Sequence, residues 1–427
     1  MPWIDSNKKS LFRNALSLYL IKGINMLFPI ILIPLIVKKL GLNYYGVYAI
    51  TISVTNLLVT VLDFGFSYSG TNMIAKIKDD SKKISEYFSI VFFSQLYMLV
   101  FAFAILLLLS LQKNFQGYGT YFILCVPMLV GYVLNPGWLF QGFEVSHINA
   151  VINLLFRALT IIILYLFLNK HNGLNFLFLV YSIGFFGWGL TGILVAVKKF
   201  KIKLVYLPFS KALPTIKKTS NIFFGTFISS IYLMGIPMIL NFFNFNINLI
   251  ASYAIAERII RGICSFISPL SLALLPYFVS GPGVEKKLLI KRYLLIALKI
   301  SLPFLFVSAL FFFGLPWVVK LIQAFKSSFS LNGPTIGNIR IQSFIIFFSV
   351  FNSIIGITSF VTLGYEVAFR RIMIIALFLS AIIFMLLIQT ANQYVGSITA
   401  LLTEIALSIF FTAFLGFKFF RSGRYEQ

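Results

Sequence analysis

The chain has 427 residues, of which 59% are hydrophobic and only 11% are charged. Soluble domains carry roughly 25% charged residues, so this composition excludes a soluble enzyme, a disordered chain and a nucleic-acid-binding domain. The formal net charge of +24 does not indicate nucleic acid, because the basic residues stand in short runs between long apolar stretches. Such runs are typical of the cytoplasmic loops of membrane proteins.

The apolar stretches have the length of membrane-spanning helices. A spanning helix needs about 20 mostly apolar residues. The first half of the chain has six such stretches, near 13–37, 47–70, 87–111, 120–140, 148–168 and 176–197. The second half has six more, near 220–243, 250–276, 293–313, 341–363, 371–390 and 394–417. The sequence therefore predicts an all-α integral membrane protein with twelve transmembrane helices.

The basic residues give this arrangement an orientation. If the N-terminus is placed inside, most Lys and Arg residues fall in the inner segments. The outer segments contain Lys38, Lys39, Lys113, Lys170, Lys320, Lys326 and Arg340. Because Lys and Arg accumulate on the cytoplasmic side, we predict that both termini are cytoplasmic and that the number of helices is even.

The most basic segment divides the chain into two halves. The predicted parts are an N-terminal six-helix bundle at 1–200, a basic cytoplasmic linker at 201–219, a C-terminal six-helix bundle at 220–417 and a cytoplasmic tail at 418–427. Each half has a similar run near the start of its second helix, Gly46-Val47-Tyr48-Ala49-Ile50 and Ala251-Ser252-Tyr253-Ala254-Ile255. Duplicated halves of this kind are typical of alternating-access transporters.

Motifs for catalysis, nucleotides or metals are missing. No loop is long enough for a soluble catalytic domain, and no phosphate-binding Gly-x-x-x-x-Gly-Lys motif occurs. The run from Gly187 to Gly192 matches the dinucleotide pattern, but it lies inside an apolar stretch and is better read as small residues that let helices pack closely. The cysteines and histidines form no metal motif. We therefore predict no enzyme activity, no catalytic residue, no cofactor and no metal.

Five cations lie inside the predicted spans: Lys22, Arg157, Arg258, Arg261 and Lys299. Each would cost about 2.5–3.5 kcal/mol at the centre of a bilayer, so each must snorkel, pair or line a wet cavity. Lys22 and Arg157 are predicted to lie near mid-depth, where a cavity is favoured over snorkelling. Lys299 could reach the cytoplasmic surface through its long stem as readily as it could line a cavity.

The eighth predicted helix concentrates charge on one sector. At 100° per residue, Glu257, Arg258 and Arg261 share one side of the helix. Glu257 and Arg261 have the i, i+4 spacing of an ion pair, which leaves Arg258 as a net positive charge. This sector is either a buried ion pair that locks two helices or an anion site, because a guanidinium fork suits phosphate oxygens.

Three further polar residues are candidates for ion coupling or for the cavity. Asp63, near the inner end of the second helix, either caps or pairs with the following basic loop or takes part in transport. Glu404 lies near mid-depth in the last helix, where a carboxylate can carry H⁺ or bind Na⁺. Asn25 shares a helix face with Lys22 and Pro29.

Several segments carry a resemblance to a known family. They are the block from Asn14 to Gly46, the run Asp63-Phe64-Gly65-Phe66 with the following Ile74-Ala75, and the run from Tyr253 to Arg258 in the second half. Over nearly its whole length the chain resembles Wzx-type polysaccharide flippases of the multidrug/oligosaccharidyl-lipid/polysaccharide (MOP) superfamily.

The resemblance implies a fold and a function. The fold would be two six-helix bundles in the V shape of MOP and MATE transporters, around a cationic cavity in the bacterial inner membrane. The function would be transfer of an undecaprenyl-diphosphate-linked oligosaccharide from the cytoplasmic to the periplasmic leaflet, with H⁺ or Na⁺ and with polysaccharide polymerase and assembly proteins as partners. Lys22 and Arg258 match segments that carry cavity charges in the family. Arg157 and Glu404 match no such segment, so they are assigned to the site only because of their depth in the membrane.

Two alternatives remain open at this level. A MATE-like exporter of small molecules would usually have an acidic cavity for cationic drugs, whereas this chain is basic. A membrane polymerase or glycosyltransferase acting on the same lipid-linked sugars would need a sizeable outer loop with paired arginines or acids. The longest outer segment, near 314–340, contains no acid.

Overall fold

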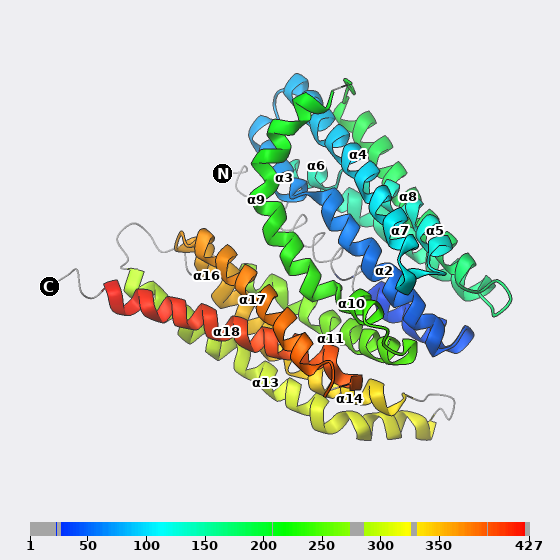
Figure 1. Cartoon of the computed structure of the whole chain (residues 1–427). Helices are drawn as coiled ribbons and strands as arrows, with labels where there is room; N and C mark the ends of the chain where they lie inside the picture. The colour runs from blue at the N-terminus through cyan, green and yellow to red at the C-terminus, as the bar shows by residue number, and fades with distance from the viewer. Residues whose placement is uncertain are drawn as a thin grey trace. The chain divides into compact units, whose positions relative to one another are not determined.

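The computed structural model describes residues 23, 27–206, 208–273, 286–325, 331–390 and 392–422. Within these ranges every regular element is a helix (Figure 1). Nine helical segments of the described part are long and apolar enough to cross a membrane, and a bent helix pair makes a tenth. The chain is thus a multi-pass, all-α membrane protein, as the sequence predicted.

The number of twelve spans stays a prediction. Most of the first predicted stretch lies outside the described residues, which show a helix only from 27 to 39. The stretch predicted at 250–276 is helix α11 (Ile247–Ala273), whose three central charges, Glu257, Arg258 and Arg261, set it apart from an ordinary apolar span.

The chain divides into two compact units. Unit 1 contains residues 1–230 and 237–245, and unit 2 contains residues 231–236 and 246–427. The boundary therefore falls within the helical region that follows the predicted basic linker. Part of that linker is itself helical, since α9 (Phe209–Met234) begins before residue 220.

Unit 1 is built from a succession of long helices (Figure 1). After the helix at 27–39 these are α2 (Leu42–Asp63), α3 (Phe66–Ile77), α4 (Ser81–Leu111), α5 (Gly119–Leu134), α6 (Gly137–Gly142), α7 (Ser146–Phe167) and α8 (Gly173–Phe200). Then α9 bends by 65° into α10 (Ile236–Phe242).

The glycine-rich run of α8 is a packing surface. A Cβ atom on Gly189 would lie 1.9 Å from the carbonyl oxygen of Gly131 on α5, and one on Gly187 would lie 2.3 Å from the ring of Phe156 on α7. Any side chain at these positions would force the helices apart. The run thus serves close helix contact, which in membranes replaces hydrophobic driving force by van der Waals packing.

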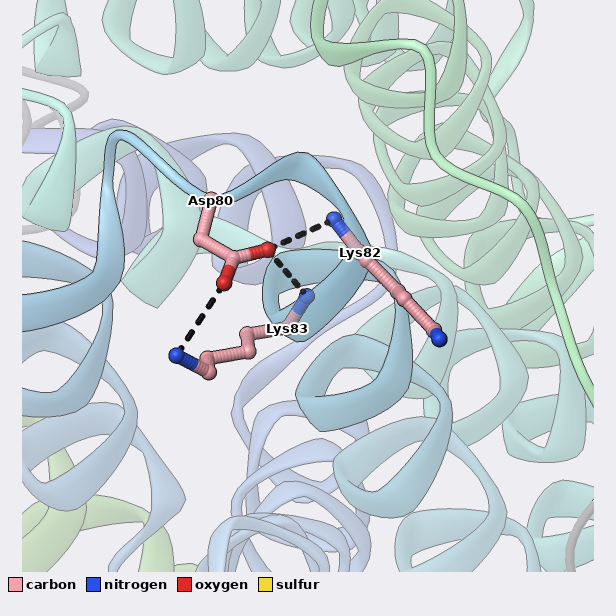
Figure 2. A network of polar contacts seen from close by, with 3 residues as sticks. All are labelled: Asp80, Lys82 and Lys83. Carbon is pink, nitrogen blue, oxygen red and sulfur yellow. Dashed lines mark hydrogen bonds and ion pairs between the residues drawn. The ribbon is translucent and has the colours of Figure 1, made fainter.

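An aspartate starts α4 at the basic end of unit 1. Asp80 accepts hydrogen bonds from the backbone N–H groups of Lys82 and Lys83, both at 3.1 Å, and pairs with the Lys83 ammonium at 3.1 Å (Figure 2). These bonds, above all the one from the Lys83 backbone, hold the pKa of Asp80 below its ordinary value. The side chain satisfies two N–H groups that the first helical turn leaves without partners.

We expect Asp80→Ala to speed hydrogen exchange of the first-turn amides of α4, while Asp79→Ala, the exposed neighbouring carboxylate, leaves them unchanged. The lowered pKa of Asp80 also determines how the stability contributed by this cap changes with pH. The cap's contribution is present above the unfolded pKa of about 3.9 and is lost as the pH falls through the lower folded value. Equal exchange in both variants at neutral pH would show that Asp80 is not the cap.

The segment that follows α8 is fastened along α4. The backbone N–H of Lys203 donates to the Ser85 hydroxyl and that of Val205 donates to the Ser89 hydroxyl, both at 3.1 Å. Lys203, Lys201 and Lys83 are all exposed. Two basic segments that are far apart in sequence therefore lie at the same end of unit 1, as the predicted topology requires.

Unit 2 contains the remaining helices (Figure 1). They are α11 (Ile247–Ala273), α13 (Lys286–Phe325), α14 (Gly333–Ser343), α15 (Ile345–Asn352), a π-helical segment (Ser353–Thr358), α16 (Ser359–Thr362), α17 (Glu366–Leu387) and α18 (Val395–Ser422). A short 3₁₀ turn (Asn392–Tyr394) precedes α18.

One cation of the predicted outer segments has a structural partner. Pro316 lies inside α13 and has no N–H for the carbonyl of Phe312, four residues earlier. Arg340 on α14 supplies the missing donor, since its Nε lies 2.8 Å from the Phe312 oxygen. The guanidinium also stacks on the Phe312 ring, with its carbon 4.5 Å from the ring centre. Arg340 thus replaces the backbone hydrogen bond that Pro316 removes from α13.

A double-mutant cycle tests this repair. We expect Arg340→Ala to lower the free energy of unfolding in detergent by about 1.5–3 kcal/mol, the contribution of a charge-assisted hydrogen bond. In a Pro316→Ala background the helix supplies its own donor, so the same substitution should cost less than half as much. Equal costs in the two backgrounds would mean that the bond to Phe312 contributes nothing to stability.

Candidate functional site

The structure separates the intramembrane cations that the sequence had grouped. Lys22 and Asn25 lie outside the described residues. Lys299 is exposed on α13, where Leu295, Leu298 and Leu302 are also exposed. This apolar outer face of the helix fits a snorkelling lysine and gives no sign of a buried binding group.

Arg157 on α7 lies among aromatic rings inside unit 1. Its guanidinium carbon is 4.4 Å from the ring centre of Phe28 and 4.8 Å from that of Phe185. Its Nε donates to the side-chain oxygen of Asn153 at 3.1 Å, and the group also interacts with the Tyr181 hydroxyl. Helix 27–39, α7 and α8 therefore meet at this one side chain.

A row of polar residues leads along α7 to Arg157. Asn149, Asn153 and Arg157 follow one another at intervals of four residues and share a helix face. The side-chain oxygen of Asn149 accepts from the Trp188 indole at 2.9 Å and from Asn135 at 3.1 Å. Leu154, Leu155 and other apolar residues are exposed on the opposite face. The face of α7 that points into unit 1 is thus its polar one.

The charge of Arg157 is not balanced by a carboxylate in the described part of the chain. The two ion pairs found there are Asp80–Lys83 and Glu257–Arg261. Aromatic faces and a neutral amide stabilise the guanidinium without neutralising it. A small open hollow adjoins Arg157 and is lined by Phe156 and Thr160 among others. The arrangement suits an anionic partner better than a cationic one.

Asp63 acts as a local cap at the break between α2 and α3. Its carboxylate accepts from the backbone N–H groups of Gly65 and Ser67, both at 3.2 Å, and from the Ser67 hydroxyl. The Tyr132 hydroxyl of α5 donates to it at 2.8 Å. These four bonds occupy both oxygens of the carboxylate, which fits the capping alternative that the sequence left open.

The charged sector of α11 lies in unit 2. Nε of Arg261 donates to Glu257 at 3.0 Å, and the two side chains are 27% and 7% exposed. Arg261 also interacts electrostatically with Glu404 on α18 and with the Tyr253 hydroxyl. Arg258 is half-buried and interacts with the same tyrosine. Arg261 therefore interacts with both Glu257 and Glu404, and Arg258 adds a further cation beside Tyr253.

Glu404 is held by two side chains that the sequence reading did not single out. Asn352, at the end of α15, donates its amide N–H to the Glu404 carboxylate at 2.8 Å and to the Glu404 carbonyl at 3.0 Å. Ser408 donates to the Asn352 oxygen at 2.7 Å. An asparagine within a long apolar stretch was the available signal, since such a residue must find a partner in the membrane.

Fold comparisons identify the class of protein. A solved MATE-family multidrug transporter of the MOP superfamily in an inward-facing conformation matches 96% of this chain and 96% of its own length with a TM-score of 0.68 at 14% identity. The eukaryotic MATE transporter AtDTX14 matches 96% of this chain and 94% of its own, with a TM-score of 0.52 at 15% identity. The chain thus has the fold of MATE-type membrane transporters.

Sequence comparisons identify the family. Residues 11–281 match the family described as "Polysaccharide biosynthesis protein", and the chain belongs to this family. A protein of Escherichia coli K12 named "Putative O-antigen transporter" is 25% identical over 94% of this chain and 95% of its own length. A protein of the same name from Shigella dysenteriae is 21% identical over 66% of this chain and 70% of its own. The chain thus combines the fold of MATE-type transporters with membership of a polysaccharide-biosynthesis family.

Proposed function

We propose that this protein is a flippase that moves undecaprenyl-diphosphate-linked oligosaccharide repeat units from the cytoplasmic to the periplasmic leaflet of the bacterial inner membrane. The observation that carries the proposal is the match with the E. coli protein, which extends over nearly the whole of both chains and is to a protein named for O-antigen transport. The substrate and the direction of transfer come from the family resemblance of the sequence.

The chemistry of this substrate fits the residues in the membrane. A lipid-linked oligosaccharide has an apolar tail, a diphosphate and a polar glycan. Arg157, whose partners among the described residues are aromatic rings, an amide and a tyrosine hydroxyl, supplies a cation that a phosphate can pair with. Lys22, Arg258 and Arg261 are the other cations proposed for the substrate site, with the polar side chain of Asn25 as a weaker candidate. Lys299 is assigned to snorkelling instead, the other alternative that the sequence left open, because it is exposed on an apolar face of α13. A guanidinium binds phosphate oxygens through two parallel hydrogen bonds.

The transport cycle proposed is alternating access between the N-terminal and C-terminal six-helix bundles, with both termini in the cytoplasm. Ion coupling or charge pairing is proposed for the acids of the membrane region, Glu257, Glu404 and Asp63, with H⁺ or Na⁺ as the coupling ion. Of these, Glu404 is the strongest candidate, because it is buried and its carboxylate has a neutral amide as its direct partner. The partners proposed are the polymerase and assembly proteins that receive the flipped unit.

The decisive experiment locates the lipid-linked intermediate in a strain that lacks the gene. The proposal expects single repeat units trapped on the cytoplasmic leaflet, together with loss of surface polysaccharide. Single units that reach the outer leaflet and fail to polymerise would indicate a polymerase. Normal polysaccharide with increased sensitivity to cationic drugs would indicate a small-molecule exporter, the alternative that the MATE fold brings with it.

A further inference from the structure

We propose that Asn352 is the positioning residue of a proton site at Glu404, and that its amide presents a donor to the ionised carboxylate and an acceptor to the protonated one. This inference rests on the ion coupling in the proposed function. It adds three points to that function: the ion is a proton, Asn352 positions the carboxyl group that binds it, and the site lies next to the π-helical segment.

Hydrogen bonds connect Glu404 with Asn352 and Ser408. Asn352 binds both the carboxylate, at 2.8 Å, and the backbone carbonyl of the same residue, at 3.0 Å. Ser408, one turn further along α18, donates to the other end of the amide at 2.7 Å. Glu404, Asn352 and Ser408 are each at most 9% exposed. Because all three side chains are buried, the orientation of the Asn352 amide decides whether the Glu404 carboxyl group faces a hydrogen-bond donor or an acceptor.

An amide is suited to both states of a carboxyl group. It has an N–H₂ group that donates and an oxygen that accepts, whereas an ionised carboxylate only accepts and a protonated one also donates. In the arrangement observed the amide donates, which matches the ionised form. After protonation the new O–H group needs an acceptor, and a half-turn of the Asn352 amide provides one. Ser408 can follow this turn, since its hydroxyl can accept from the turned amide and donate to the Glu404 backbone carbonyl, 3.0 Å away, which loses its bond from Asn352.

The backbone next to Asn352 is built differently from the rest of the helix. The π-helical segment Ser353–Thr358 begins directly after it, and the Thr358 hydroxyl donates to the Ser353 carbonyl five residues earlier at 3.0 Å. Gly356 in this segment packs against α18, where an added Cβ would lie 2.8 Å from the Phe411 ring. Single π-helical turns inside α-helices are frequent at functional sites. A turn of the Asn352 amide therefore takes place at the junction between α15 and the π-helical segment.

The charged groups around Glu404 are compatible with a proton. Arg261 of α11 faces it and shares its charge with Glu257, while Tyr232 of α9 and Cys264 of α11 are the other titratable groups that interact with it. A proton makes Glu404 neutral and leaves the Glu257–Arg261 pair balanced. A metal cation would change the charge of the site by the same amount, but it would also need several oxygen ligands, whereas the side-chain partner of the Glu404 carboxylate is the N–H donor of Asn352.

The chain contains its own structural control for this network. On α14, Asn338 accepts from the Ser397 hydroxyl of α18, and Asn338 and Ser397 are fully buried. This second Asn–Ser pair joins α18 to a neighbouring helix in the same way, but the hydrogen bonds of the pair include no carboxylate. Loss of packing should therefore affect both asparagines, whereas a change in protonation should follow Asn352 alone.

The test is an infrared pH titration of the purified protein in lipid, which follows the protonated carboxyl band and needs no substrate. We expect a band that is missing in Glu404→Gln and whose midpoint rises by about one pH unit or more in Asn352→Leu. Both forms of the carboxyl group lose a bond, but the charge-assisted bond to the ionised form is the stronger of the two. Ser408→Ala should shift the midpoint less in the same direction. Asn338→Leu should leave it unchanged.

Several results would overturn the proposal. They are an unmoved midpoint in Asn352→Leu, an equal shift in Asn338→Leu, or displacement of the proton by Na⁺ at constant pH. If Asn352→Leu does not fold, Asn352→Asp provides the same test, because two adjacent carboxyl groups share a proton and also raise the midpoint. The titration does not depend on the cargo. A shifted midpoint in a protein that flips no lipid would thus refute the proposed function and leave the proton site intact.

Discussion

Arg157→Ala is expected to abolish surface polysaccharide in a complemented deletion strain, with normal amounts of the protein in the membrane. In the part of the chain that the structure describes, the substitution removes a cation whose partners are rings and an amide, so no carboxylate there loses an ion-pair partner. Folding should therefore survive, whereas the proposed contact with phosphate is lost. Loss of one charge-assisted bidentate pair should reduce transport by well over tenfold.

Lys299 provides the matched control, because it is also a cation of a predicted span but is exposed on α13. Lys299→Ala should transport like the wild type. Arg157→Lys keeps the charge but loses the planar fork, so it should restore only part of the activity. Full complementation by Arg157→Ala would remove this residue from the substrate site, and equal loss in both alanine variants would indicate a general effect of intramembrane charge.

Arg261→Ala is expected to lower the amount of folded protein, unlike Arg157→Ala. It leaves Glu257, which is only 7% exposed, as a buried carboxylate without its ion-pair partner. Breaking a buried ion pair from one side costs about 3–5 kcal/mol, because the remaining charge is uncompensated. The measurement is the midpoint of unfolding of the purified protein, together with its level in the membrane.

A double variant separates stability from function at this pair. Glu257→Gln combined with Arg261→Gln removes both charges, so the unfolding midpoint should return close to that of the wild type. If Arg261 binds substrate, transport should still be absent in the double variant. Recovery of both stability and transport would mean that the pair only locks the helix in place, the alternative that the sequence left open.

The local parts of the candidate site were accessible from the sequence. The pairing of Glu257 with Arg261 follows from a spacing of four residues on one helix, and the capping alternative for Asp63 follows from its place at a helix end. Packing by the glycines near Gly189 was also readable, because small residues within an apolar span have few other uses.

The contacts between helices were not accessible in the same way. Arg157 and Lys299 are both isolated cations in apolar stretches, yet the first lies among aromatic rings and the second is exposed. Arg340 was counted only as a basic residue of an outer segment, whereas it binds the carbonyl of Phe312 on another helix. The sequence alone does not connect Asn352 with Glu404, because the two residues lie 52 positions apart and meet only through the packing of their helices.

The sequence by itself determined that this chain crosses the membrane many times and where most of its long apolar helices lie. These properties depend on composition and on a fixed rise per residue. Only the tertiary structure decided which way each charge faces. In a soluble helix a polar side marks the surface, but lipid tails and a protein core are equally apolar, so a helix that is hydrophobic all round gives no sign of its buried face.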